Sequence, residues 1–190
     1  MVGVAYTIFD TMVGRCGIAW SDAGIVAVQL AEARELDTRR RLIKQFPEAR
    51  ESRPAVGIES AIEGVTAALS GQIWDFSDVV LDLGGVAAFD QRVYEALRAI
   101  PHGETATFAD IARKLRASGA IQAVGRAVRH NPFAVIVPCH RALEAAGDTG
   151  GTCYNGGSVT RRRLLSLEGA FAKTGPTLFD VLLPPRPRPA

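Results

Sequence analysis

The chain has 190 residues, of which 47% are hydrophobic and 22% are charged, and its formal net charge at pH 7 is +2. These proportions are typical of a globular protein rather than a disordered or membrane one. No stretch reaches the roughly 18 apolar residues that a membrane span needs, and the first residues do not resemble an export signal. We therefore expect a cytoplasmic protein with no membrane partner.

The cysteines are Cys16, Cys139 and Cys153. An odd number of cysteines in a chain without an export signal predicts reduced thiols rather than a disulfide framework. No C-x-x-C pair or His/Cys cluster has the spacing of a zinc site, so we expect no metal.

The first part of the chain predicts an α+β unit. Short apolar runs at 2–9, 15–20 and 24–30, separated by Gly and Asp turn signals, predict an antiparallel meander. Helical patterns follow at 35–46 and 58–69. The first of these helices places its apolar residues Leu36, Leu42, Ile43 and Phe46 on one side. Its basic run, 39–41, is interpreted as a solvated face and is given no role.

A glycine-rich stretch, Leu83-Gly84-Gly85-Val86, predicts a domain boundary near residue 84. The chain then divides into an α+β domain at 1–84, a second domain at 85–175 and a tail at 176–190. In this tail, Pro184, Pro185, Pro187 and Pro189 exclude a regular helix or an interior strand, and we expect a mobile extension.

The second domain predicts a helix-turn-helix pair. Phe89, Val93, Leu97 and Ile100 recur at helical spacing. Thr107 and Asp110 have the spacing of a capping box and begin a helix that runs through Leu115, and a further helix follows Ser118-Gly119 and must end at Pro132. Such pairs read DNA, although they also occur in proteins that do not bind DNA.

The helix before Pro132 has one polar and one apolar face. Gln122, Arg126 and Arg129 share the polar face, whereas Ile121, Val124 and Val128 lie on the apolar face. Small residues on this helix favour close approach to a nucleic acid: Gly119, Ala120, Ala123, Gly125 and Ala127. The alternative is tight helix–helix packing with solvated arginines.

A thiol and an imidazole follow a short apolar run. Ala134–Val137 predicts a buried strand that Pro138 stops, immediately before Cys139 and His140. A cysteine is a strong nucleophile only as thiolate, and a neighbouring base makes that form available. Neighbours on an extended chain point in opposite directions, so a water or a sharp turn is needed between them. The alternative is a buried cysteine that only packs.

The residues at 131–141, NPFAVIVPCHR, together with AVGRAVR at 123–129, closely resemble the signature of O6-alkylguanine-DNA alkyltransferases. Further matches are the segments at 89–97, 100–105 and 164–168 and the pair Gly156-Gly157. The resemblance is strong over about residues 85–170 and loose before them.

The resemblance implies an RNase H-like α+β N-terminal domain followed by a winged helix-turn-helix domain that binds the minor groove. It implies a monomer, nucleoid-associated in a bacterium, whose partner is double-stranded DNA carrying O6-alkylguanine, with the target base flipped out. No cofactor is implied, because the alkyl group comes from DNA. Cys139 would accept this group irreversibly, one group per molecule.

The resemblance also implies roles for other residues. His140 would be the base, acting through a water; Glu168 would orient His140; Asn131 would be a hinge between the recognition helix and the active-site turn. Sequence spacing alone favours a solvated helix residue at Glu168, and only the resemblance reverses this. The expected DNA-binding residues are Phe108, Gln122, Ala123, Gly125, Arg126, Arg129 and Arg141. The expected pocket residues are Val137, Pro138, Tyr154, Asn155, Gly156 and Gly157.

Three features depart from the family's pattern. Phe108 stands where the family usually has tyrosine, which removes a proton donor and predicts slower transfer. Gln122 replaces an arginine that fills the space left by the flipped base, and we expect Arg126 to compensate in part. The loop at 147–157 is longer than usual and brings Cys153 near the predicted pocket.

Other functions remain alternatives. Phe108 and Gln122 favour a damage sensor, or a specialised alkyltransferase with weak activity on O6-methylguanine. A non-enzymatic helix-turn-helix DNA-binding protein would need only the basic face, and a cysteine hydrolase would use Cys139 and His140. Neither of these last two explains the whole segment from 131 to 141.

Overall fold

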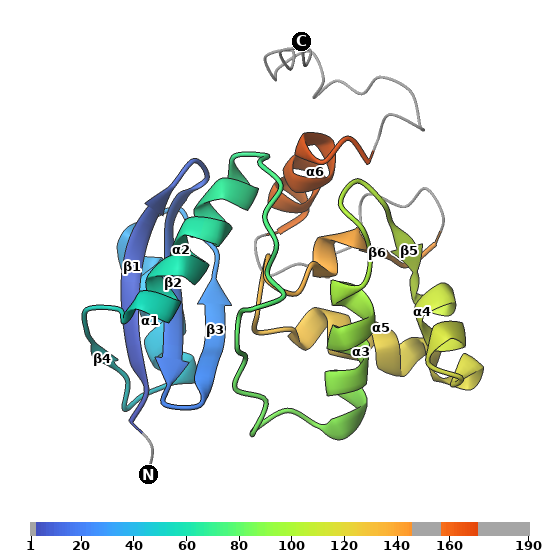
Figure 1. Ribbon diagram of the computed structural model, residues 1–190, viewed down its shortest axis with the longest axis horizontal. Helices are drawn as coiled ribbons and strands as arrows, with labels where there is room; N and C mark the ends of the chain where they lie inside the picture. The colour runs from blue at the N-terminus through green and yellow to red at the C-terminus, as the bar shows by residue number, and fades with distance from the viewer. Residues whose placement is uncertain (1–2, 146–156, 171–190) are drawn as a thin grey trace.

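The computed structural model describes residues 3–145 and 157–170. Figure 1 shows a β-sheet with two helices beside a mainly helical half. The elements of the first half are β1 (Ala5–Thr11), β2 (Gly14–Ser21), β3 (Gly24–Gln29), α1 (Glu35–Gln45), β4 (Arg50–Glu51) and α2 (Val56–Leu69). Those of the second half are α3 (Ala88–Arg98), β5 (Ala106–Thr107), α4 (Phe108–Lys114), η1 (Ser118–Ala120), α5 (Ile121–His130), η2 (Cys139–Arg141), β6 (Ala142–Leu143) and α6 (Gly157–Leu167).

The predicted antiparallel meander is confirmed. The sheet has the order β3-β2-β1-β4, in which β1 pairs antiparallel with β2 and β2 with β3. The short strand β4 pairs parallel with β1 at its edge. Gly24 begins β3 with a φ of +140°, and a Cβ there would lie 2.7 Å from the Val80 carbonyl oxygen. The turn before β3 therefore needs glycine both for its backbone conformation and for this close approach.

Helix α1 covers one face of the sheet, but with fewer apolar residues than its pattern predicts. Leu42 is buried with Tyr6, Ala19 and Ala27 of the strands. Leu36 and Ile43, expected on the same buried side, are 50% and 37% exposed, so that part of the prediction is wrong. Thr38 and Leu42, four residues apart, are the buried residues of α1, and Leu36 and Ile43 lie beyond this narrow buried stripe.

The basic run of α1 lies in ion pairs. Arg39 pairs with Glu35 of the preceding turn and with Glu51 of β4, and its guanidinium lies 5.7 Å from the centre of the Tyr6 ring. Arg40 and Arg41 pair with Asp37 and Glu32. The contact of Arg39 with Glu51 joins α1 to the edge strand β4.

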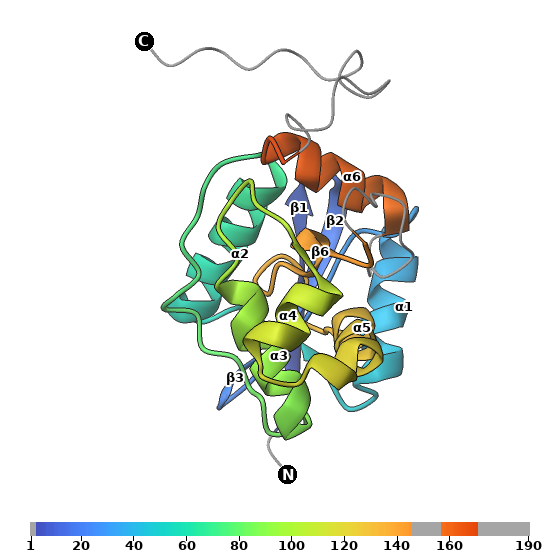
Figure 2. The ribbon, with the colours of Figure 1, turned by 90° about the vertical axis from the view of Figure 1, so that its right-hand side faces the viewer.

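One hydrophobic cluster joins the two halves of the molecule. It contains Ile18 and Val28 of the sheet together with Val93 of α3, Phe133 and Cys139. The Val28 N–H donates to the Pro132 carbonyl at 2.7 Å, so the segment after α5 is bonded directly to β3. In Figure 2, α3, α4 and α5 lie in front of the sheet and α6 lies across one end of both halves. The sheet therefore supports the segment that carries the thiol.

The predicted capping box of α4 is confirmed. The Asp110 N–H donates to Thr107 Oγ1 at 3.1 Å, and the Thr107 N–H donates to Asp110 Oδ2 at 3.0 Å. The paired helix, α5, ends at His130, immediately before Asn131 and Pro132, as the proline requires. In the described part of the chain, no helix is long and apolar enough to cross a membrane.

Candidate functional site

The apolar run before the thiol is a tight buried turn, and the prediction of a strand at 134–137 is wrong. Ala134 and Val137 bridge each other, and the Val137 N–H donates to the Phe133 carbonyl at 2.8 Å. Val135 at the tip has a φ of 73°, in the left-handed region that a β-branched residue rarely adopts. The run is as buried as a central strand would be, which is why its composition resembles one.

The side chain of Asn131 bonds to backbone groups at both ends of this turn. Its Nδ2 donates to the Val137 carbonyl at 3.0 Å, and its Oδ1 accepts from the Phe133 N–H at 3.0 Å. The side chain is buried, with the residue 3% exposed. Since Asn131 directly follows α5, these two bonds link the end of that helix to the turn that leads to Cys139.

Cys139 and His140 lie in the 3₁₀ turn η2. The Cys139 N–H donates to the Val137 carbonyl at 2.8 Å, and the Arg141 N–H donates to the Pro138 carbonyl at 3.0 Å. This is the sharp turn expected between the adjacent thiol and imidazole, because successive side chains in a 3₁₀ helix diverge by about 120° rather than the 180° of an extended chain. Cys139 is 3% exposed and His140 1% exposed.

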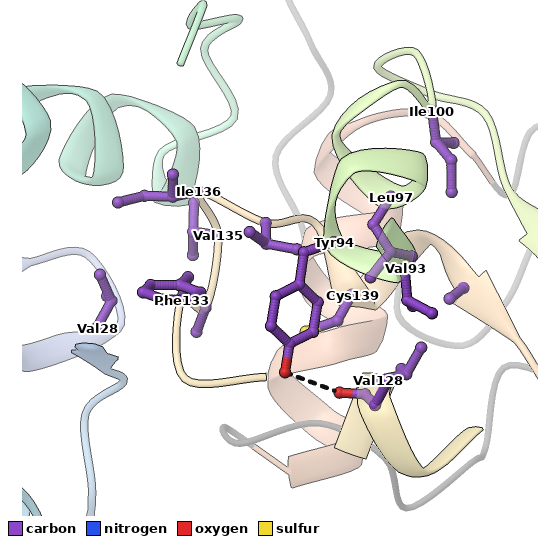
Figure 3. Packing of buried hydrophobic residues seen from close by; sticks show 14 of the residues in the cluster. Val28, Val93, Tyr94, Leu97, Ile100, Val128, Phe133, Val135, Ile136 and Cys139 are labelled. Carbon is purple, nitrogen blue, oxygen red and sulfur yellow. Dashed lines mark hydrogen bonds between the residues drawn. The ribbon is translucent and has the colours of Figure 1, made fainter. Parts of the chain in front are cut away.

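Tyr94 of α3 lies beside the sulfur, as Figure 3 shows. Its Oη donates to the Ala127 carbonyl at 3.3 Å, and its ring meets the Phe133 ring edge to face with centroids 5.9 Å apart. Burial raises the pKa of the Tyr94 phenol, and the charges of Asp90 and Cys139 raise it further. The phenol is therefore neutral at physiological pH. Sequence reasoning missed Tyr94, although its spacing of three residues from Leu97 indicated the apolar side of α3.

Glu168, just beyond α6, contacts the imidazole of His140. The distance between Nε2 of His140 and Oε1 of Glu168 is 2.8 Å, and the two side chains are 2% and 8% exposed. Burial lowers the pKa of His140, although Glu168 opposes this shift, so the ring is neutral at pH 7. Burial alone would raise the Glu168 pKa, but hydrogen bonds from His140 and Arg141 outweigh it and lower that pKa to about 2. The solvated alternative for Glu168 is thereby excluded.

Arg141, which was expected at the DNA, binds the same carboxylate. Its Nε donates to Glu168 Oε2 and its Nη2 to Glu168 Oε1, both at 2.9 Å. Its Nη1 donates to the Ile100 carbonyl at 2.7 Å, and its side chain is only 15% exposed. These internal acceptors occupy its guanidinium, and its contact with DNA stays a prediction.

Arg161 of α6 is a second buried cation that sequence reasoning missed. It is 1% exposed; its Nε donates to the His140 carbonyl at 3.4 Å and its Nη2 to the Ala142 carbonyl at 2.5 Å. Its charge also lowers the pKa of His140. The available signal was its spacing from Leu164 and Leu165, which places it on the buried face of α6.

The two faces of α5 are as predicted, apart from one residue. Gln122, Arg126 and Arg129 are exposed, whereas Val124 and Val128 are buried. Ile121, expected on the apolar face, is 41% exposed because it lies in the first turn of the helix, beyond the packed region.

Two expected DNA-binding residues are buried between helices instead. A Cβ at Gly125 would lie 3.1 Å from the Phe108 ring, so the small residue is explained by packing of α5 on α4. Phe108 itself is 5% exposed. The packing alternative therefore accounts for Gly125, while Ala123 is half-buried beside the polar face.

The expected pocket residues are only partly described. Val137 and Pro138 are buried in the turn before Cys139, and Gly157 begins α6 with a φ of 75°. Tyr154, Asn155 and Gly156, with Cys153 and most of the long loop, lie outside the described residues, as does the tail at 176–190. Over 3–145 and 157–170, no three His, Cys, Asp or Glu side chains gather closely enough to hold a metal ion.

Comparison with known proteins gives consistent matches. Residues 88–170 match the family model of the 6-O-methylguanine DNA methyltransferase DNA-binding domain. A methylated-DNA–protein-cysteine methyltransferase of Mycobacterium bovis is 47% identical over 120 residues, which cover 63% of this chain and 70% of the relative. The Methanothermobacter thermautotrophicus protein of the same name is 33% identical over 153 residues, 80% of this chain and 78% of the relative.

Solved structures extend the likeness to the first half of the chain. The crystal structure of Mycobacterium tuberculosis O6-methylguanine methyltransferase superposes with a TM-score of 0.70 at 34% identity, over 94% of this chain and 99% of that one. The same organism's OGT in complex with DNA gives a TM-score of 0.69 at 34% identity, over 87% and 93% of the two chains. The mixed α+β fold is thus shared over nearly the whole length. The chain belongs to the methylated-DNA–protein-cysteine methyltransferase family.

Proposed function

We propose that this protein repairs double-stranded DNA by transferring the alkyl group of an O6-alkylguanine to the sulfur of Cys139. The observation that carries the proposal is the buried thiol of Cys139, next in sequence to a neutral imidazole that is itself bonded to the ionised Glu168. This is the arrangement of nucleophile, base and orienting carboxylate.

In the proposed reaction, His140 removes the thiol proton. An ionised carboxylate only accepts hydrogen bonds, so the bond between Glu168 and Nε2 requires the neutral ring to carry its proton on Nε2. Nδ1 then has the lone pair that takes the proton of Cys139, directly or through one water. Glu168 stabilises the imidazolium that results.

The thiolate then attacks the alkyl carbon. The S–C bond forms as the bond between that carbon and O6 breaks, and guanine leaves with the electron pair and takes up a proton from the site. A thioether is a very poor leaving group, so each molecule accepts one alkyl group and does not turn over. No cofactor takes part.

Burial of the thiol supports extrusion of the damaged nucleotide. Cys139 is 3% exposed, and a stacked base cannot reach such a sulfur without leaving the duplex. We propose that α5 supports the extruded base: Gln122 and Ala123 lie at the groove, and the exposed Arg126 and Arg129 contact phosphates. Asn131 then couples the position of this helix to the turn before Cys139.

The finer architecture belongs to the same proposal. We assign residues 1–84 to an RNase H-like domain and 85–175 to a winged helix-turn-helix domain, acting as a monomer. The α4–α5 pair and the parallel β5–β6 pair that precedes the long loop support the second assignment. The four-stranded sheet with α1 on one face and α2 on the other supports the first.

The test is transfer from an oligonucleotide duplex with a labelled O6-methylguanine. We expect one label per protein molecule, a mass increase of about 14 Da on the peptide that contains Cys139, and no transfer to Cys139→Ser. Cys16→Ser is the matched control, because Cys16 is buried in the sheet and has no proposed role. Repeated turnover, or label on another residue, would refute the proposal.

A damage sensor is the second candidate, favoured by Phe108 and Gln122. Phe108 lacks a phenolic proton donor, and Gln122 is exposed on α5 without the usual positive charge. Tight binding of methylated duplex, without any adduct on Cys139 after prolonged incubation with reducing agent, would favour the sensor.

A further inference from the structure

Arg141 makes a bidentate ion pair with the buried Glu168 carboxylate, and the transfer reaction does not explain this contact. Nε and Nη2 of the guanidinium donate separately to Oε2 and Oε1, both at 2.9 Å. Oε1 also accepts from His140 Nε2 at 2.8 Å. Both carboxylate oxygens are therefore held, and the carboxylate cannot rotate about its axis without breaking a charged hydrogen bond.

We propose that Arg141 is a positioning residue that sets the tautomer of His140. By keeping Glu168 ionised and fixed in orientation, it keeps the imidazole proton on Nε2 and the lone pair on Nδ1. This inference rests on the proposed function, in which Nδ1 takes the proton of Cys139.

Protonation of Glu168 would reverse the tautomer. A neutral carboxyl group carries an O–H, and its shortest contact would then donate to Nε2 of His140. The ring proton would have to lie on Nδ1, which could no longer accept the thiol proton. The ionisation state of Glu168 thus decides whether His140 can act as a base toward the cysteine. In histidine sites generally, the hydrogen-bond partner of one ring nitrogen fixes which nitrogen carries the proton.

Burial makes the ionised form costly without a cation. The Glu168 side chain is 8% exposed, and desolvation favours its neutral form. A guanidinium is charged at every accessible pH and matches the geometry of a carboxylate, whereas lysine offers a single point charge. Arg141 therefore supplies both the positive charge and the two parallel N–H donors that keep Glu168 ionised and fixed in orientation.

The guanidinium is itself held in place. Its Nη1 donates at 2.7 Å to the carbonyl of Ile100, which follows α3 and is 7% exposed. Gly103, three residues later, has a φ of 78°, and a Cβ there would lie 2.8 Å from the Glu168 carbonyl oxygen. The segment after α3 thus fixes Arg141 on one side and closely approaches Glu168 on the other.

The experiment compares wild type with Arg141→Met and Arg141→Lys in the full-length protein. Arg34→Met is the matched control, since Arg34 pairs with Asp37 on the surface of α1 at 71% exposure. Two quantities are measured for each protein: the ¹⁵N chemical shifts of the His140 ring, which identify the tautomer, and the pH dependence of single-turnover methyl transfer.

We expect the Nε2–H tautomer in wild type and in Arg34→Met. In Arg141→Met, we expect the Nδ1–H tautomer to be populated and transfer near pH 6 to fall by about 100-fold, the contribution of a positioned base, with recovery at higher pH as Glu168 ionises. Arg141→Lys should be intermediate. Its acid limb should lie at higher pH than that of wild type.

A wild-type tautomer and pH profile in Arg141→Met would overturn the inference. If that variant does not fold, Arg141→Lys decides the question. An acid limb of its pH–rate profile that lies at the wild-type pH would overturn the role of the bidentate contact. Failure of wild type itself to accept the methyl group would refute the proposed function. Unchanged transfer by the Arg141 variants, with an active wild type, would refute only the role of Arg141, so the two failures are distinguishable.

Discussion

Replacement of Asn131 by alanine tests how strongly the end of α5 is coupled to the active-site turn. The substitution removes the acceptor of the Phe133 N–H and one of two donors to the Val137 carbonyl. The Cys139 N–H still donates to that carbonyl at 2.8 Å, so only the Phe133 N–H loses the partner that Asn131 provided.

The magnitude follows from this difference. A buried donor left without its acceptor costs about 1–3 kcal/mol, and the loss of one bond to a carbonyl that stays paired costs about 0.5–1.5 kcal/mol. We expect Asn131→Ala to lower the free energy of unfolding by about 2–4 kcal/mol, which corresponds to a fall in Tm of about 5–15 °C for a chain of this size.

The assay is urea denaturation followed by circular dichroism, combined with single-turnover methyl transfer at a temperature where the variant is folded. Asn131→Asp is the matched variant, because it keeps the acceptor for Phe133 but turns a carboxylate oxygen toward the Val137 carbonyl. Its destabilisation should lessen at acid pH, relative to Asn131→Ala, as the carboxyl group gains an O–H donor. Ile121→Ala, on the exposed first turn of the same helix, should have a much smaller effect.

A change in unfolding free energy below about 0.5 kcal/mol, the range of ordinary surface substitutions, would refute this reasoning. Wild-type transfer by folded Asn131→Ala would refute the coupling between α5 and the turn, even if the protein were destabilised.

The remaining predictions concern DNA binding, helix packing and pH. Arg126→Ala should weaken binding to duplex DNA and reduce the slope of log affinity against log salt by about one; an unchanged slope in fluorescence anisotropy titrations would exclude a phosphate contact. Gly125→Leu should lower the free energy of unfolding by about 1–3 kcal/mol through overpacking against Phe108, and equal stability in urea would contradict the packing. Stability should fall between pH 7 and pH 4, since the folded-state pKa values of His140 and Glu168 are both lowered, the latter to about 2, and the unfolded chain therefore binds more protons. For His140 the loss begins as pH falls below its unfolded pKa of about 6.5, and for Glu168 below about 4.3; a His140→Asn variant with an equally steep decline between pH 6.5 and 5 would contradict the assignment to His140.

Local sequence signals determined much of the secondary structure. The meander, the capping box at Thr107 and the division of α5 into an exposed basic face and a buried face depend on neighbours within a few residues, and the structure agrees with each. The adjacency of Cys139 and His140 was also visible, but only the family resemblance favoured a nucleophile over a buried cysteine that packs. Assignment of Glu168 to the same site required the family resemblance.

Tertiary structure decided which charged and apolar residues are buried. Leu36, Ile43 and Ile121 fit apolar helical patterns but lie beyond the area that their helices bury. Periodicity gives the side of a helix that packs, whereas the extent of contact depends on the neighbouring element.

The active-site turn and its cations depended on long-range contacts. Composition could not distinguish a buried strand at 134–137 from a buried turn, because the choice depends on the side chain of Asn131 and on its bonds to Phe133 and Val137. Arg141 was expected at the DNA because a sequence places no acceptors around it; only the fold brings Glu168 and the Ile100 carbonyl to its guanidinium. The sequence by itself determined the helices around the candidate nucleophile Cys139, while the tertiary structure decided the electrostatic surroundings of His140, since those come from residues distant along the chain.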